Sequence, residues 1–79
     1  MRFFVVDDEK FALERMVREL KTAAPEAEVV AFSDPNKLLE FAREHSCDVA
    51  FLDVRMGSMT GVELAKKLKE FMPKLNIIF

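Results

Sequence analysis

The stretch that decides the fold is Phe3-Phe4-Val5-Val6-Asp7-Asp8, an apolar run that ends in two acids. A second run of the same kind is Val49-Ala50-Phe51-Leu52-Asp53. Short apolar runs bounded by polar residues are typical of strands buried on both faces, as in parallel sheets. The carboxyl ends of parallel strands meet at one edge, where ligands bind, so we expect Asp7, Asp8 and Asp53 to converge. Carboxylates at such a short separation repel each other, and each raises the pKa of the others unless a cation or a reaction uses them. This spacing therefore indicates a functional site.

Strand and helix patterns alternate along the rest of the chain. Strands are predicted over residues 2–6, 28–32, 47–53 and 75–79. One helix is predicted over residues 9–24, a second opens at Pro35, and a third runs from Thr60 to the stop at Pro73. The order βαβαβαβ is typical of a parallel sheet with right-handed crossover helices. We therefore predict a single α/β domain.

The helices carry capping signals and apolar faces. Asp8 is placed to cap the first helix, and Asp34 precedes a proline at the first helical position of the second. Thr60 and Glu63 have the spacing of a capping box. Apolar residues recur at helical spacing, namely Leu13, Met16, Val17, Leu20 and Ala24, then Leu38, Phe41 and Ala42, then Leu64, Ala65, Leu68, Phe71 and Met72. Each helix thus has one face to pack on the sheet.

Composition narrows the class of protein. The chain has 79 residues, of which 51% are hydrophobic, with two glycines and three prolines, which favours a small packed domain over disorder. A net charge of −2 gives no reason to expect nucleic acid or membrane as a direct partner. The single cysteine, Cys47, excludes an internal disulfide, and neither a transmembrane run nor a signal peptide is recognisable. We therefore expect a cytoplasmic protein.

Three motifs, in this order and spacing, resemble the receiver domain of bacterial response regulators. They are Val5-Val6-Asp7-Asp8-Glu9, Phe51-Leu52-Asp53-Val54-Arg55-Met56 and Met59-Thr60-Gly61-Val62-Glu63-Leu64. The resemblance covers essentially the whole chain, residues 1–79. It implies a flavodoxin-like, doubly wound parallel sheet with strand order 2-1-3-4, the first helix alone on one face and the other two on the opposite face.

The resemblance also implies the chemistry of the site. A sensor histidine kinase would pass a phosphoryl group to Asp53, with Mg²⁺ as cofactor. Asp8 and Asp53 would bind Mg²⁺ directly, Asp7 would bind it mainly through water, and the backbone carbonyl of Arg55 would complete the site. These oxygens are the hard ligands that Mg²⁺ prefers, and an aspartate can form an acyl phosphate. The chain would then be a phosphoacceptor and not an enzyme, beyond self-phosphorylation and autodephosphorylation.

Two features depart from the family pattern. The family commonly has Met-Pro-Gly-Met where this chain has Met56-Gly57-Ser58-Met59, so the loop is expected to be more flexible. The family also carries a Ser or Thr after the fourth strand and a Lys after the fifth, and neither falls within the 79 residues. We therefore expect a truncated receiver that lacks the fifth strand and the last two helices.

Two other functions stay open. One is a receiver-like fragment that no longer signals and serves as a self-associating interaction module. The fourth strand would leave an apolar edge, so a symmetric homodimer is expected. The other is a phosphate hydrolase, which is disfavoured because such enzymes usually place an aspartate where this chain has Arg55. His45, Cys47, Met56 and Met59 are expected to be structural.

Overall fold

The computed structural model describes all residues, 1–79. Its strands are β1 (Arg2–Val6), β2 (Glu28–Phe32), β3 (Val49–Leu52) and β4 (Asn76–Ile78). These four parallel strands form one sheet in the order β2-β1-β3-β4. The helices are α1 (Lys10–Ala23), α2 (Pro35–Ala42) and α3 (Gly61–Phe71). The βαβαβαβ order, the parallel pairing and the strand order implied by the resemblance are all confirmed.

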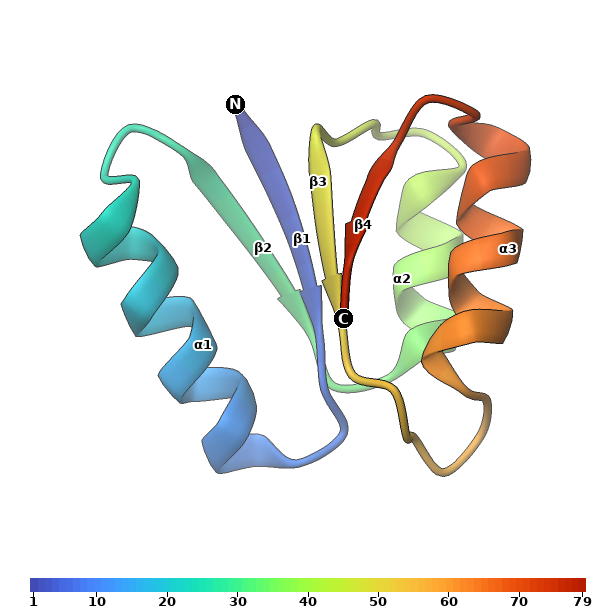
Figure 1. Cartoon of the computed structure of the whole chain (residues 1–79), viewed down its shortest axis with the longest axis horizontal. Coiled ribbons are helices and arrows are strands. Elements are labelled where there is room, and N and C mark those ends of the chain that lie inside the picture. The colour runs from blue at the N-terminus through green and yellow to red at the C-terminus, as the bar shows by residue number, and fades with distance from the viewer.

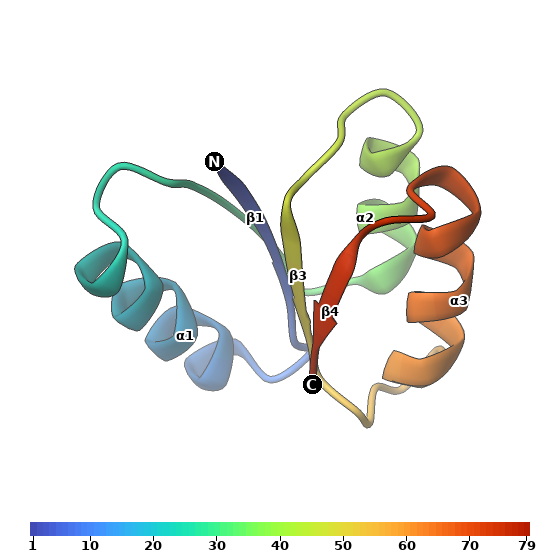
Figure 2. The same ribbon diagram turned by 45° about the horizontal axis from the view of Figure 1, so that its top comes forward.

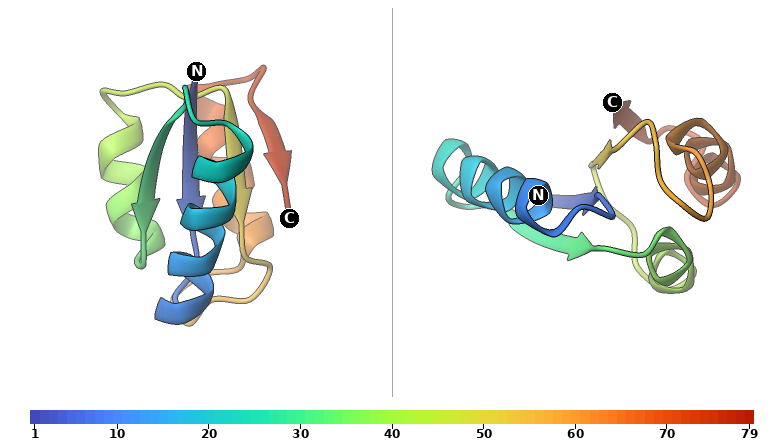
Figure 3. Two further views of the ribbon diagram at one scale, coloured as in Figure 1. Left: turned by 90° about the vertical axis from the view of Figure 1, so that its left-hand side faces the viewer. Right: turned by 90° about the horizontal axis from the view of Figure 1, so that it is seen from below.

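The helices divide unequally between the two faces of the sheet. Figure 1 shows α1 on one side, and α2 and α3 side by side on the other. The turned view in Figure 2 and the end-on view in Figure 3 show the same division. The reversal of direction between the first crossover and the next two places α1 apart, as predicted, because each crossover is right-handed.

The core lies on the face that α2 and α3 cover. Strand residues Phe4, Val6, Ala50 and Leu52 point toward this face and are buried. The helices and loops supply the remaining buried members, Leu38, Ala42, Met56, Leu64, Leu68 and Leu75. Full burial of a Val, Leu, Phe or Met side chain contributes roughly 1.5–3 kcal/mol, so the face that α2 and α3 cover holds the main hydrophobic core.

The opposite face is packed more thinly. Phe3 and Val5 of β1 are buried there, and the Phe3 ring meets the Phe51 ring edge-to-face with centroids 5.5 Å apart. No residue of α1 is fully buried, and the Met16 side chain is 38% exposed. The apolar side of α1, which includes Met16, faces the sheet, but one helix covers only part of this face.

Most helix caps follow the sequence signals, and one differs. Asp34 caps α2: it precedes Pro35, the first helical residue, and its side chain accepts a hydrogen bond from Asn36 N–H. Thr60 and Glu63 form the predicted capping box of α3. The prediction that Asp8 caps α1 is wrong. Glu9 is the cap residue, and its carboxylate accepts hydrogen bonds from the backbone N–H groups of the first helical turn.

Two strands, β3 and β4, are shorter than predicted. β3 begins at Val49 and not at Cys47, because the Cys47 N–H donates to the sulfur of Met72 (3.4 Å) instead of to a strand. β4 spans only Asn76–Ile78 and pairs with β3 alone, so it lies at the edge of the sheet, where Figure 3 shows the C-terminus.

None of the three helices has the length and apolar character needed to cross a bilayer.

Candidate functional site

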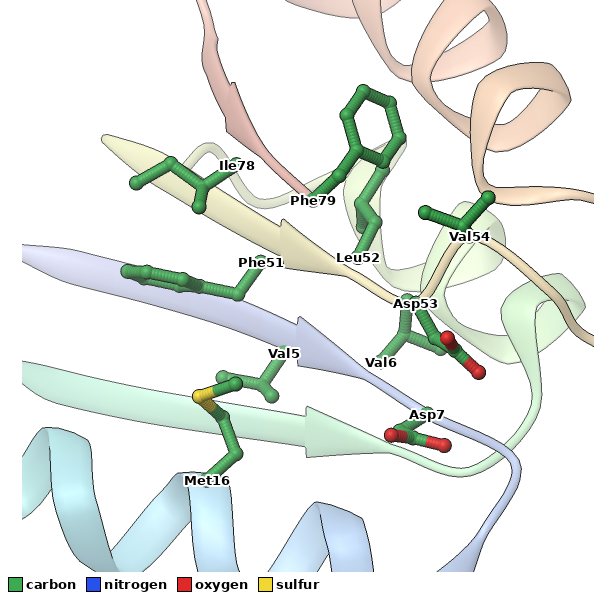
Figure 4. Close-up of a pocket in the computed structure, with 10 residues that line it drawn as sticks. All are labelled: Val5, Val6, Asp7, Met16, Phe51, Leu52, Asp53, Val54, Ile78 and Phe79. Carbon is green, nitrogen blue, oxygen red and sulfur yellow. The ribbon is translucent and has the colours of Figure 1, made fainter.

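The site is built where β1 and β3 end side by side. Val6 pairs with Leu52, so the next residues, Asp7 and Asp53, emerge together at one edge of the sheet. The backbone holds them there, because Asp53 N–H donates to Val6 O (3.1 Å) and Asp7 N–H donates to the carbonyl of Phe32 (3.2 Å). Figure 4 shows both carboxylates just beyond the last apolar residues of their strands.

The predicted convergence of three carboxylates is present. One ligand oxygen from each of Asp7, Asp8 and Asp53 lies within 4.8 Å of the other two. Asp7 and Asp53 are partly buried, whereas Asp8 is exposed. A group of hard oxygen donors this compact suits Mg²⁺, which typically binds proteins through one or two carboxylates and keeps several waters.

The environment of Asp7 disfavours its charge. Partial burial raises the pKa of the Asp7 carboxyl above its usual value, and the neighbouring carboxylates of Asp53 and Asp8 raise it further. A hydrogen bond from Glu9 N–H to Asp7 Oδ1 (2.9 Å) opposes this shift. The raised pKa agrees with the repulsion expected from the sequence, although desolvation is its larger cause.

Asp8 is tied to a distant loop and not to a helix. Its Oδ2 accepts a hydrogen bond from the backbone N–H of Gly57 (2.9 Å), 49 residues away in the sequence. On the other side of the site, Arg55 N–H donates to Asp53 Oδ1 (3.4 Å), and the Arg55 side chain is exposed. The loop after β3 therefore contacts two of the three acids through its backbone.

Gly61 allows this loop to return close to the strand end. Its N–H donates to Val54 O (2.9 Å), so α3 begins directly against the residues after β3. A Cβ at Gly61 would overlap the carbonyl oxygen of Asp53 and lie 3.1 Å from the Cα of Val54. Sequence reasoning used this residue only as part of a motif, because the close approach depends on how the loop folds back.

An apolar pocket of about 210 Å³ lies beside the acids. Asp7 and Asp53 stand at one end of it, and Met16, Phe51 and Ile78 line the rest, on the face that α1 partly covers (Figure 4). The pocket was not expected from the sequence, because it depends on how far α1 extends over the sheet.

The residues expected to be structural lie away from the acids or in the core. Cys47 precedes β3, at the opposite end of the sheet, and burial raises its pKa to about 11, so it is a poor nucleophile. The His45 ring stacks on the Phe41 ring with centroids 3.9 Å apart. Met56 is buried in the core and Met59 packs against it. None of these four side chains takes part in the acidic cluster.

Comparison with known proteins agrees with this geometry. The model of the response regulator receiver domain family matches residues 3–79. Stress response regulator protein 1 of Debaryomyces hansenii is 36% identical over 74 residues, which are 94% of this chain and 30% of that protein. The chain thus spans about a third of that relative's length.

Solved structures show the same fold. Response regulator TrrA of Thermotoga maritima, in complex with Mg²⁺ and BeF, has a TM-score of 0.86 at 25% identity, covering 96% of this chain and 64% of that one. TrrA in complex with histidine kinase ThkA has a TM-score of 0.84 at 25% identity, with the same coverage. The strand order, the three acids and the family match lead to one conclusion: this chain belongs to the response regulator receiver domain family of two-component signalling.

Proposed function

We propose that Asp53 accepts a phosphoryl group from a sensor histidine kinase. The observation that carries the proposal is the meeting of Asp7, Asp8 and Asp53 within 4.8 Å at the ends of β1 and β3. Asp53 is the only one of the three acids that directly follows β3. Hydrogen bonds from Asp53 N–H to Val6 O and from Gly61 N–H to Val54 O hold the backbone on both sides of it. The TrrA structures support it, since that relative is seen with BeF and with a histidine kinase.

The domain contributes one nucleophilic carboxylate oxygen to the transfer. A carboxylate oxygen of Asp53 forms a bond to phosphorus as the bond between phosphorus and the donor nitrogen breaks, and the electron pair stays on the imidazole of the kinase. The product is an acyl phosphate. Positioning and charge compensation are the main contributions of the domain. The hydrogen-bonded end of β3 supplies the positioning. The charge compensation needs a cation, because three carboxylates surround the incoming phosphoryl group.

The residues that would hold Mg²⁺ are Asp8 and Asp53, with the Arg55 carbonyl, and Asp7 through water. The cation would offset the repulsion among the acids and the phosphoryl oxygens. This assignment is supported by the compact set of carboxylate oxygen donors, the kind of ligand that Mg²⁺ prefers. Incubation with acetyl phosphate, with and without Mg²⁺, tests it: modification should require the cation and should be absent from Asp53→Asn.

The alternatives have less support. A phosphate hydrolase would need a second acid after the nucleophile, and position 55 is an exposed arginine. Self-association is compatible with phosphoacceptance and has its own motivation. Ile78 and Phe79 of the edge region are 49% and 59% exposed, and the pocket beside them is lined mostly by apolar side chains. We propose that the 79-residue chain buries this region in a symmetric dimer.

A further inference from the structure

We propose that the backbone N–H of Gly57 positions Asp8 for cation binding, an inference that rests on the function proposed above. The bond from Gly57 N–H to Asp8 Oδ2 (2.9 Å) joins the turn after β1 to the loop after β3. It is the one hydrogen bond that the Asp8 side chain makes. Gly57 would thus use its main-chain N–H to position Asp8, a proposed Mg²⁺ ligand from another part of the fold.

Without this bond, Asp8 would be the least restrained of the three acids. Asp7 and Asp53 are partly buried and follow directly from paired strands, whereas Asp8 is exposed, one residue beyond the backbone bond from Asp7 N–H. Because Glu9 caps α1, the helix does not restrain the Asp8 carboxylate either. Ordering a free side chain on binding reduces affinity. A carboxylate already held over the site avoids that loss.

The identity of residue 57 makes the bond possible. A proline at this position would have no N–H to donate. The bond also links the loop after β3 to the turn after β1. Glycine itself is not required: φ at Gly57 is not positive, and an added Cβ would lie 3.8 Å from Asp8 Oδ2, in ordinary contact. What matters here is the N–H group.

The bond should strengthen cation binding and not compete with it. A carboxylate has two oxygens with about four lone-pair directions, and the Gly57 N–H uses one of them. Oδ1 and the remaining lone pair of Oδ2 stay available to a cation. Removing the N–H should therefore weaken Mg²⁺ binding, by about two- to tenfold for one modest hydrogen bond.

The test compares Gly57→Pro, which deletes the donor, with Gly57→Ala, which keeps it. Mg²⁺ is titrated while the amide shifts of the site are followed, and amide dispersion shows that each variant is folded. Gly57→Pro should bind Mg²⁺ about two- to tenfold more weakly than the wild type, and Gly57→Ala should bind like the wild type. If the proline variant does not fold, replacing the amide of residue 57 by an ester removes the same N–H.

A second measurement, on the metal-free wild type, detects the hydrogen bond directly and does not depend on Mg²⁺ affinity. Scalar coupling between the Gly57 amide nitrogen and the Asp8 carboxyl carbon reports the hydrogen bond itself, and its absence would overturn the proposal. Equal or tighter Mg²⁺ binding by the variant without the N–H would overturn the positioning role and leave the metal site standing. If the wild type binds no Mg²⁺, the proposed function fails, and the positioning role fails with it.

Discussion

The main chain of Asp53 leaves no room for a side chain at Gly61. A Cβ there would overlap the Asp53 carbonyl oxygen and lie 3.0 Å from its carbonyl carbon. The same glycine donates its N–H to Val54 O (2.9 Å), so the end of β3 and the start of α3 are in backbone contact. The position of the proposed phosphoacceptor therefore depends on a residue that contributes no side chain.

Substituting Gly61 by alanine should be destabilising. The new methyl group meets backbone atoms, which cannot move aside as a flexible side chain could. We expect the free energy of unfolding to fall by about 1–3 kcal/mol, the range for overpacking a tight site. Urea unfolding measures this, with Gly57→Ala as control because its added Cβ has only an ordinary contact at 3.8 Å. Equal stability of the two variants would contradict the tight approach.

Neutralising Asp7 should stabilise the metal-free fold. The folded-state pKa of Asp7 is raised, so protonated Asp7 favours the folded state, and this contribution is lost as the pH rises from below 3.8 through the raised pKa. Asp7→Asn has no such loss and can still accept the bond from Glu9 N–H. At neutral pH it should exceed the wild type by a fraction of a kcal/mol, because solvent screens a partly exposed charge.

Thermal unfolding of both proteins from pH 3 to pH 7, in buffers without divalent cations, checks the sign of this effect. The advantage of Asp7→Asn should grow as the pH rises. An advantage that stays constant or shrinks with rising pH would show that burial and the neighbouring acids do not disfavour the charge of Asp7.

Removing the capping box should weaken α3. The Thr60 hydroxyl oxygen accepts a hydrogen bond from Glu63 N–H (3.1 Å), and Thr60 N–H donates to the Glu63 carboxylate (3.3 Å). Thr60→Ala should lower the free energy of unfolding by about 1 kcal/mol, whereas Thr60→Ser keeps the oxygen and should lose little. Chemical denaturation distinguishes the two. A serine variant as unstable as the alanine variant would mean that the hydroxyl is not what caps the helix.

The elements of this fold could be predicted because each is encoded locally. β1 and β2 have the predicted bounds, and Asp34 and Thr60 cap their helices as the sequence indicates. Parallel strands place the three acids at the same edge of the sheet, and the pairing of β1 with β3 then brings them together. Strand order does not follow from periodicity and required the family resemblance.

The details that failed or were missed are those that depend on competition between neighbours. Asp8 and Glu9 are both able to cap α1, and Glu9 is the cap while Asp8 bonds to a loop 49 residues away. Cys47 fits a strand pattern, yet its N–H meets the sulfur of Met72. The roles of Gly57 and Gly61 require knowing where the loop after β3 turns back, and no local pattern encodes that path.

The 79-residue chain should self-associate. One helix covers only part of its face of the sheet, and Ile78 and Phe79 are exposed beside an apolar pocket. Sedimentation equilibrium at micromolar concentration should show a monomer–dimer equilibrium, and Ile78→Lys should shift it toward monomer, because a charge on an edge strand opposes pairing. Phe11→Lys is a matched control, since Phe11 is 73% exposed on α1 and does not line the pocket. A wild type that stays monomeric at all concentrations would refute the association.

The measurement that tests the central claim most directly is intact-mass analysis after incubation with acetyl phosphate and Mg²⁺. The wild type should gain one phosphoryl group, lost again in hydroxylamine as acyl phosphates are, and Asp53→Asn should gain none. Omitting Mg²⁺ should suppress the modification, because the acids would then repel the incoming anion. Modification of Asp53→Asn to the same extent as the wild type would contradict the assignment of Asp53 as the phosphoacceptor.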